Sequence, residues 1–110
     1  MNFGCQNMVN PIRRILLKHP SDAYQNQQIL NQQSPQLNYI HIPNFQKAVL
    51  DYEVFKELIC SSGAEIHFLS KDNITSPDSI YTHDPCIVSN RGVILCSMGK
   101  NDRRHEPDTI

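Results

Sequence analysis

The sequence feature that most constrains the fold is one amphipathic stretch between residues 44 and 62. Apolar residues recur there at spacings of three and four, which places them on a single face of a helix. Asn44 suits the N-cap, and Gly63 stands where a left-handed residue commonly ends a helix. The apolar positions are Phe45, Ala48, Val49, Tyr52, Phe55, Leu58 and Ile59. We therefore predict a helix over 44–62 whose aromatic residues belong to the core.

A β-rich run lies on each side of this helix. The first is IRRILLK (12–18), which follows a proline and ends at His19-Pro20, and the second is EIHFL (65–69). His67 alternates with apolar neighbours, so we expect it on the strand surface. A helix that joins two strands of one sheet makes a right-handed parallel crossover. The fold class predicted from these elements is α/β.

Two further β-rich runs, CIVS (86–89) and VILC (93–96), are joined by Asn-Arg-Gly. This is typical of a hairpin, because Gly92 can adopt the positive φ that such a turn needs. One register across the turn sets the Cys86 thiol opposite that of Cys96. The two thiols then form either a redox clasp or, as we favour, a pair of small hydrophobic groups. The hairpin either joins the edge of the first sheet or opens a second module.

Between the first strand and the helix lies a segment dominated by amides. Nine of the fourteen residues from Gln25 to Asn38 are Gln or Asn, and such a tract has few groups able to pack a core. We expect residues 20–43 to form a long surface loop. A solvated loop is the favoured interpretation, and a flexible lid that closes over a ligand is the alternative. A lid would make its apolar contacts through Ile29 and Leu30.

Composition excludes several classes of protein. The net charge of -1 and pI near 6.5 show no excess of positive charge of the kind that binds nucleic acid or an anionic membrane. No apolar run is long enough for a membrane span, and the opening residues contain no apolar core of a secretory signal, so we expect a cytoplasmic protein. The four cysteines lack CxxC spacing, so we expect reduced thiols, no metal and no cofactor. Small sheets with uncovered edges call for more protein beside them, for which a homodimer is one arrangement.

Asp78 and Asp84 are the candidate functional carboxylates. They stand six residues apart in DSIYTHD, so an extended segment would point both to the same side. Without a basic partner nearby in sequence, such a pair suits acid–base catalysis, a hard cation or a cationic ligand. A divalent metal would want more oxygen ligands, whereas the planar donors of a guanidinium match carboxylates well. Two solvated loop aspartates remain the alternative.

The stretch PDSIYTHDPCIVSNRGVILCSMGKNDRRHEP resembles the N-terminal segment of dimethylarginine dimethylaminohydrolases and their amidinotransferase and arginine deiminase relatives. That superfamily carries an Asp-Ser motif with an aromatic residue and a second Asp, then a hairpin, then G-x-x-x-R-R-x-E. Here the last motif runs from Gly99 to Glu106. The upstream IRRILLKHP and GAEIHFL also resemble the start of such proteins, so the likeness covers nearly the whole chain.

The resemblance implies a pentein fold, a pseudo-fivefold α/β propeller of ββαβ-type modules. Residues 1–110 would be the incomplete N-terminal part of one enzyme domain, about its first one to two modules. Asp84 would grip the guanidinium of a small-molecule substrate, with Asp78 assisting. Arg103 or Arg104 would handle the substrate carboxylate or brace the site, and Leu30 would correspond to the lid residue. A solvated basic turn is the alternative for the two arginines.

The sequence departs from the superfamily in two ways. His83 stands before Asp84, where relatives commonly carry Arg or Glu, so selection among guanidines is open. None of the cysteines or histidines matches the nucleophilic Cys or the catalytic His. We therefore expect an N-terminal fragment of a guanidine or amidine C–N hydrolase that has no turnover alone. A stand-alone protein that binds a cationic ligand or partner, and an amidinotransferase parent, remain the alternatives.

Overall fold

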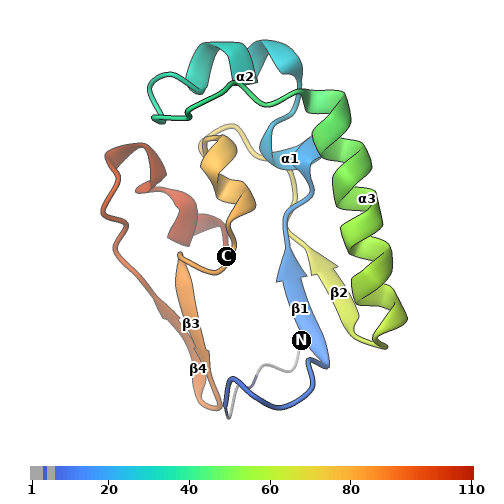
Figure 1. Cartoon of the computed structure of the whole chain (residues 1–110). Coiled ribbons are helices and arrows are strands. Elements are labelled where there is room, and N and C mark those ends of the chain that lie inside the picture. Colours follow the sequence, from blue (N-terminus) through green and yellow to red (C-terminus); the bar gives the residue numbers. More distant parts are fainter. Residues whose placement is uncertain (1–3, 5–6) are drawn as a thin grey trace.

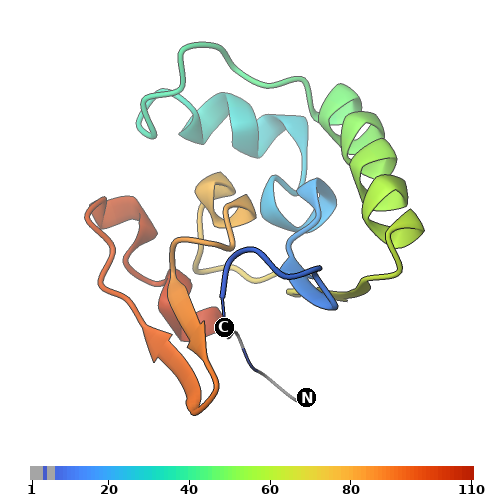
Figure 2. The same ribbon diagram turned by 60° about the horizontal axis from the view of Figure 1, so that its bottom comes forward.

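A computed structural model describes residue 4 and residues 7–110 of the chain. Its elements form a small α/β structure with two separate two-stranded sheets. In both ribbon views the two sheets do not join, and the long helix and the hairpin lie on opposite sides of the first strand (Figures 1 and 2). The α/β class is confirmed, and the described residues form no propeller. Among them, no helix combines the length and apolar character needed to cross a membrane.

The first unit is the predicted strand–helix–strand crossover. Strands β1 (Arg14–Leu17) and β2 (Glu65–Phe68) pair in parallel, and helix α3 (Phe45–Ser61) connects them. The Asn44 side chain accepts a hydrogen bond from the Lys47 amide, and Gly63 follows the helix with a φ of 85°. Helix, cap and both strands are therefore confirmed, with the strands shorter than predicted.

The hairpin forms from β3 (Cys86–Ser89) and β4 (Gly92–Leu95), but in a different register from the one predicted. Ser89 pairs with Gly92, so Cys86 faces Leu95 and the predicted pairing of the two thiols is wrong. The turn has two residues because Gly92, with a φ of 141°, already belongs to β4. The Cys86 and Cys96 thiols are both free. The hairpin does not join the edge of β1 or β2, so its predicted placement at the edge of the first sheet is wrong, and its role as the start of a second module stays a prediction.

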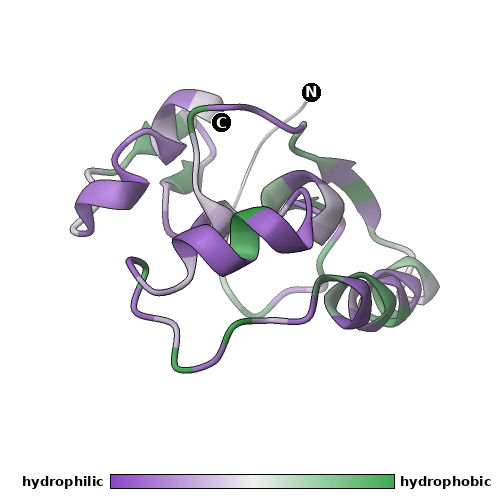
Figure 3. Ribbon diagram, turned by 90° about the horizontal axis from the view of Figure 1, so that it is seen from above, coloured by the Kyte–Doolittle hydropathy of each residue, from purple (hydrophilic) through white to green (hydrophobic). Residues whose placement is uncertain are grey.

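The prediction of an irregular loop between residues 20 and 43 is wrong in part. The segment contains helices α1 (Pro20–Ala23) and α2 (Gln27–Gln33). Asn26 caps α2 by accepting a hydrogen bond from the Ile29 amide. Most amides of α2 face solvent, while Leu30 is fully buried and anchors the helix. The partly buried Gln27 donates to the Pro43 carbonyl and accepts from the Phe45 amide, which ties α2 to the start of α3. Figure 3 shows α2 as hydrophilic except for one apolar turn. A buried leucine, an N-cap and the contacts of Gln27 thus hold this polar helix in place.

The core is small and includes only part of the apolar face of α3. Buried Ala23, Tyr24 and Leu30 form the main cluster, and the partly buried Phe45 and Ala48 of α3 pack against it. No residue of α3 is fully buried. Its more exposed apolar side chains are Leu50, Val54, Phe55 and Leu58. The prediction that the helix aromatics belong to the core is therefore confirmed for Phe45 and wrong for Phe55, which is 40% exposed.

Candidate functional site

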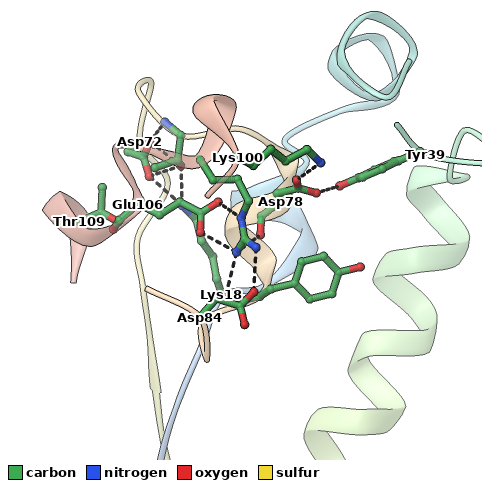
Figure 4. Close-up of polar contacts among 11 residues, drawn as sticks. Lys18, Tyr39, Asp72, Asp78, Asp84, Lys100, Glu106 and Thr109 are labelled. Atoms are coloured by element: carbon green, nitrogen blue, oxygen red, sulfur yellow. Dashed lines mark hydrogen bonds and ion pairs between the residues drawn. The ribbon is translucent and has the colours of Figure 1, made fainter. Parts of the chain in front are cut away.

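One pocket of about 510 Å³ lies where η1 (Pro77–Ile80), η2 (Asn101–Arg103) and the segment after α2 approach each other. It collects both candidate aspartates and one of the two candidate arginines. The lining residues are Leu37, Tyr39, Asp78, Tyr81, Asp84, Met98, Gly99, Lys100 and Arg103. They carry two acidic and two basic side chains, whose charges balance, beside apolar surface from residues such as Leu37 and Met98. Figure 4 shows the polar contacts around it.

Asp78 lies at the buried end of the pocket. It belongs to the 3₁₀ helix η1 and is only 3% exposed, so the extended segment assumed from the sequence is not formed. The Tyr39 hydroxyl donates to Asp78 Oδ1 at 2.6 Å, and Lys100 Nζ donates to Oδ2 at 2.8 Å (Figure 4). A buried carboxylate is stable only when it is paired in this way. Both oxygens of Asp78 thus already have partners within the chain.

Tyr39 is held as a neutral hydrogen-bond donor. Burial of the phenol and its hydrogen bond to Asp78 raise the pKa of Tyr39 far above its usual value. The residue before it, Asn38, has a φ of 64°, which turns the chain after Pro35 so that Tyr39 reaches the pocket. The contact joins the amide-rich segment to the acidic motif, 39 residues further along the chain.

Asp84 lies at the open side of the pocket and is paired with Arg103. Arg103 Nη1 donates to Asp84 Oδ2 at 2.8 Å, and the Asp84 side chain remains 47% exposed. Its other oxygen, Oδ1, accepts no hydrogen bond from the described residues and is available to a ligand. The basic partners of the two aspartates lie 22 and 19 residues further along the chain, in the G-x-x-x-R-R-x-E stretch.

Arg103 is braced from its other side by Glu106. Nε and Nη2 of Arg103 each donate to one oxygen of Glu106 at 2.8 Å, a bidentate pair in which Glu106 is only 2% exposed. The hydrogen bonds to Glu106 raise the pKa of Arg103 despite its burial, and Asp84 adds to the effect. The guanidinium also lies 5.9 Å from the centre of the Tyr81 ring. Arg103 thus lines the pocket with a guanidinium that is fixed in position and permanently charged.

Contacts further from the pocket hold the acidic motif in place. The Thr82 hydroxyl donates to the Leu16 carbonyl at 2.9 Å, which ties the motif to β1. Lys18, 1% exposed, donates to Asp72 at 2.7 Å and to Thr75 at 3.2 Å. Burial opposes ionisation of Asp72, but the bonds from Lys18 and Thr75 prevail and lower its pKa to about 2. This buried pair fixes the loop that leads into η1.

Three candidate residues lie away from the pocket. Arg104 is exposed and donates to the His105 ring, so only Arg103 of the two arginines lines the site. Leu30 packs in the core beside Tyr24 and is not in contact range of a ligand in the pocket. His83 is exposed and does not line the pocket either.

The cysteines are equally remote. Cys60, Cys86 and Cys96 are absent from the pocket lining, and Cys5 lies outside the described residues. Burial raises the pKa of the Cys86 thiol, and the nearby Cys96 adds to this, which disfavours a reactive thiolate. No group of three or more His, Cys, Asp or Glu among residues 4 and 7–110 could hold a metal ion.

Sequence reasoning missed Tyr39, Leu37 and Lys100 as pocket residues. Lys100 stands inside the quoted G-x-x-x-R-R-x-E stretch, so its proximity to Arg103 was a usable signal. Tyr39 and Leu37 belong to the amide-rich segment, and no local pattern connects them to Asp78. No protein family, curated protein or solved structure matches this chain.

Proposed function

We propose that this chain forms the guanidinium-holding half of the active site of a hydrolase. The parent enzyme would cleave a C–N bond of a guanidine or amidine such as dimethylarginine or arginine. The observation that carries the proposal is the meeting of Asp78, Asp84 and Arg103 around one pocket. These three residues come from the two motifs that resemble guanidino-group-modifying enzymes.

The chemistry of Asp84 supports a cationic, planar ligand. Its Oδ1 is accessible, and its Oδ2 already holds the Nη1 of Arg103 at 2.8 Å. A guanidinium donates two parallel N–H groups, so it matches a carboxylate better than an ammonium does. Glu106 already holds the Arg103 guanidinium through just such a fork, in the same part of the chain.

Bond cleavage would require residues supplied by other protein segments. In the enzymes that the sequence resembles, a cysteine thiolate attacks the guanidinium carbon and a histidine transfers protons. No described cysteine or histidine lines this pocket. Further modules of a pentein ring would bring these two residues and would also cover the apolar surface of the hairpin, where Ile87 and Ile94 are more than half exposed. An amidinotransferase parent would use the same half-site.

A second candidate function is non-catalytic binding of a cationic ligand or partner. Among the described residues that line the pocket there is no cysteine or histidine, which favours binding without turnover for the 110 residues taken alone. In that case a homodimer would cover the free edges of the two sheets. Both candidates share the same ligand chemistry and differ in whether turnover occurs in a longer protein.

Calorimetric titration with L-arginine tests the shared chemistry, and citrulline serves as the uncharged isostere. We expect saturable binding of arginine, no binding of citrulline, and loss of arginine binding in Asp84→Asn. Asp51→Asn is the matched control, because Asp51 is an exposed acid on α3 that pairs with Lys47. Equal binding by the Asp84→Asn variant and the wild type would contradict the proposal. We expect no citrulline to form from arginine on the isolated chain.

A further inference from the structure

We propose that Lys100 is an internal competitor for the ligand, and that the cation of the ligand displaces it from Asp78 and thereby releases the segment over the pocket. The inference rests on the proposed function, since it names how that site is regulated. Lys100 is then a positioning residue that lowers the affinity for cations and holds residues 37–39 in place until a cation binds.

The contacts of Lys100 carry this inference. Its Nζ donates to Asp78 Oδ2 at 2.8 Å and to the Leu37 carbonyl at 2.6 Å. One ammonium thus joins a pocket carboxylate to the backbone of the segment that follows α2. The Tyr39 hydroxyl reaches the other oxygen of the same carboxylate at 2.6 Å. We call residues 37–39 the strap, because both of its ties converge on Asp78 (Figure 4).

Charge explains why the ligand and Lys100 exclude one another. Asp78 is 3% exposed, and a buried carboxylate with one adjacent cation gains little from a second cation that repels the first. A guanidinium that enters beside Asp78 therefore takes the place of the ammonium. Lys100 is suited to leave, because its side chain is 32% exposed and an ammonium is readily hydrated in the adjacent solvent.

Displacement of Lys100 has a mechanical consequence. When Nζ leaves Asp78 it also leaves the Leu37 carbonyl, so the strap loses one of its two side-chain ties to Asp78. The Tyr39 hydroxyl remains bonded to Asp78, and the Leu37 and Tyr39 amides still donate to the Gln33 and Ser34 carbonyls. Cation binding at Asp78 is therefore coupled to loosening of the strap, and a neutral ligand of the same shape has no such effect.

The test compares Lys100→Met with wild type in titrations with L-arginine and citrulline. Lys47→Met is the matched control, since it also removes one lysine from an Asp pair, on the exposed face of α3. We expect Lys100→Met to bind arginine at least tenfold more tightly than wild type, with Lys47→Met unchanged. If wild type binds arginine and Lys100→Met binds it equally or more weakly, the inference fails and the proposed function stands. If neither protein binds arginine, the proposed function fails and the competition fails with it.

Hydrogen exchange on the wild-type chain tests the strap without any variant. The amides of Leu37 and Tyr39 donate to the Gln33 and Ser34 carbonyls, which makes their exchange rates measurable reporters. We expect saturating arginine to accelerate exchange at both amides severalfold, and citrulline to leave it unchanged. Unchanged or slower exchange with bound arginine would overturn the release of the strap.

Discussion

Replacement of Asp72 by Asn tests the buried pair that supports the acidic motif. Lys18 is 1% exposed and depends on Asp72 for its counter-charge, and Thr75 is its one further side-chain partner among the residues that the structure describes. Loss of one partner from a buried ion pair commonly costs about 3–5 kcal/mol. Because Asp72 is itself 19% exposed, we expect about 3 kcal/mol at pH 7, the low end of this range.

The pH dependence reports all the contacts of the Asp72 carboxylate, which accepts hydrogen bonds from Lys18, Thr75 and the Ile74 amide. The pKa of Asp72 is lowered from 3.8 to about 2 in the folded chain, so its contribution is complete above the unfolded pKa. It is then lost as the pH falls from about 4 to about 2, and amounts to about 2 kcal/mol. Asp72→Asn should lack this part of the acid dependence.

Urea unfolding followed by circular dichroism, at pH 7 and in steps from pH 5 to pH 2, measures both effects. The double variant Lys18→Met, Asp72→Asn is the control, because removal of both charges should restore at least half of the stability lost. The reasoning is refuted if Asp72→Asn unfolds within 0.5 kcal/mol of wild type at pH 7, or if its acid dependence equals that of wild type.

Two further substitutions test the site wall and the core. Arg103→Ala should cost about 3 kcal/mol in urea unfolding because it leaves Glu106 buried and unpaired, while exposed Arg104→Ala should change stability by less than about 0.5 kcal/mol. Equal losses of stability in Arg103→Ala and Arg104→Ala would contradict the role of Arg103 as the partner of buried Glu106. Leu30→Ala should cost about 2–5 kcal/mol, since this side chain is fully buried, while Leu50→Ala, 68% exposed, should cost less than about 0.5 kcal/mol. A small effect at Leu30 would mean that α2 is not anchored by the core.

Local signals in the sequence predicted most of the first unit of the fold. The spacing of apolar residues, the N-cap Asn44 and the terminal Gly63 all predict α3. The β-rich runs before and after this helix pair in one sheet through the crossover that the helix makes. The prediction of a loop for the amide-rich segment was wrong in part because the burial of Leu30 and Leu37 and the hydrogen bonds of Gln27 to the start of α3 outweigh the polar composition. The predicted register of the hairpin was wrong by one residue. Both faces of the hairpin carry apolar residues, so the pattern of apolar positions does not select one pairing of the strands.

The candidate site was predictable only where a motif spanned it. Asp78, Asp84 and Arg103 were found from two motifs, although the extended geometry assumed for the first of these motifs was wrong. Tyr39 and Lys100 complete the surroundings of Asp78 through contacts that span 39 and 22 residues of the chain. Such long-range contacts depend on how the elements pack, which a local pattern does not encode.

A residue-resolved NMR titration of the chain with L-arginine tests whether Asp78, Asp84 and Arg103 form a guanidinium-binding site. We expect saturable shift changes at the amides of Tyr81, Asp84 and Gly99, which surround the pocket, and none of these changes with citrulline. Shift changes confined to the exposed acids of α3, or no saturable change at the pocket amides, would contradict such a site.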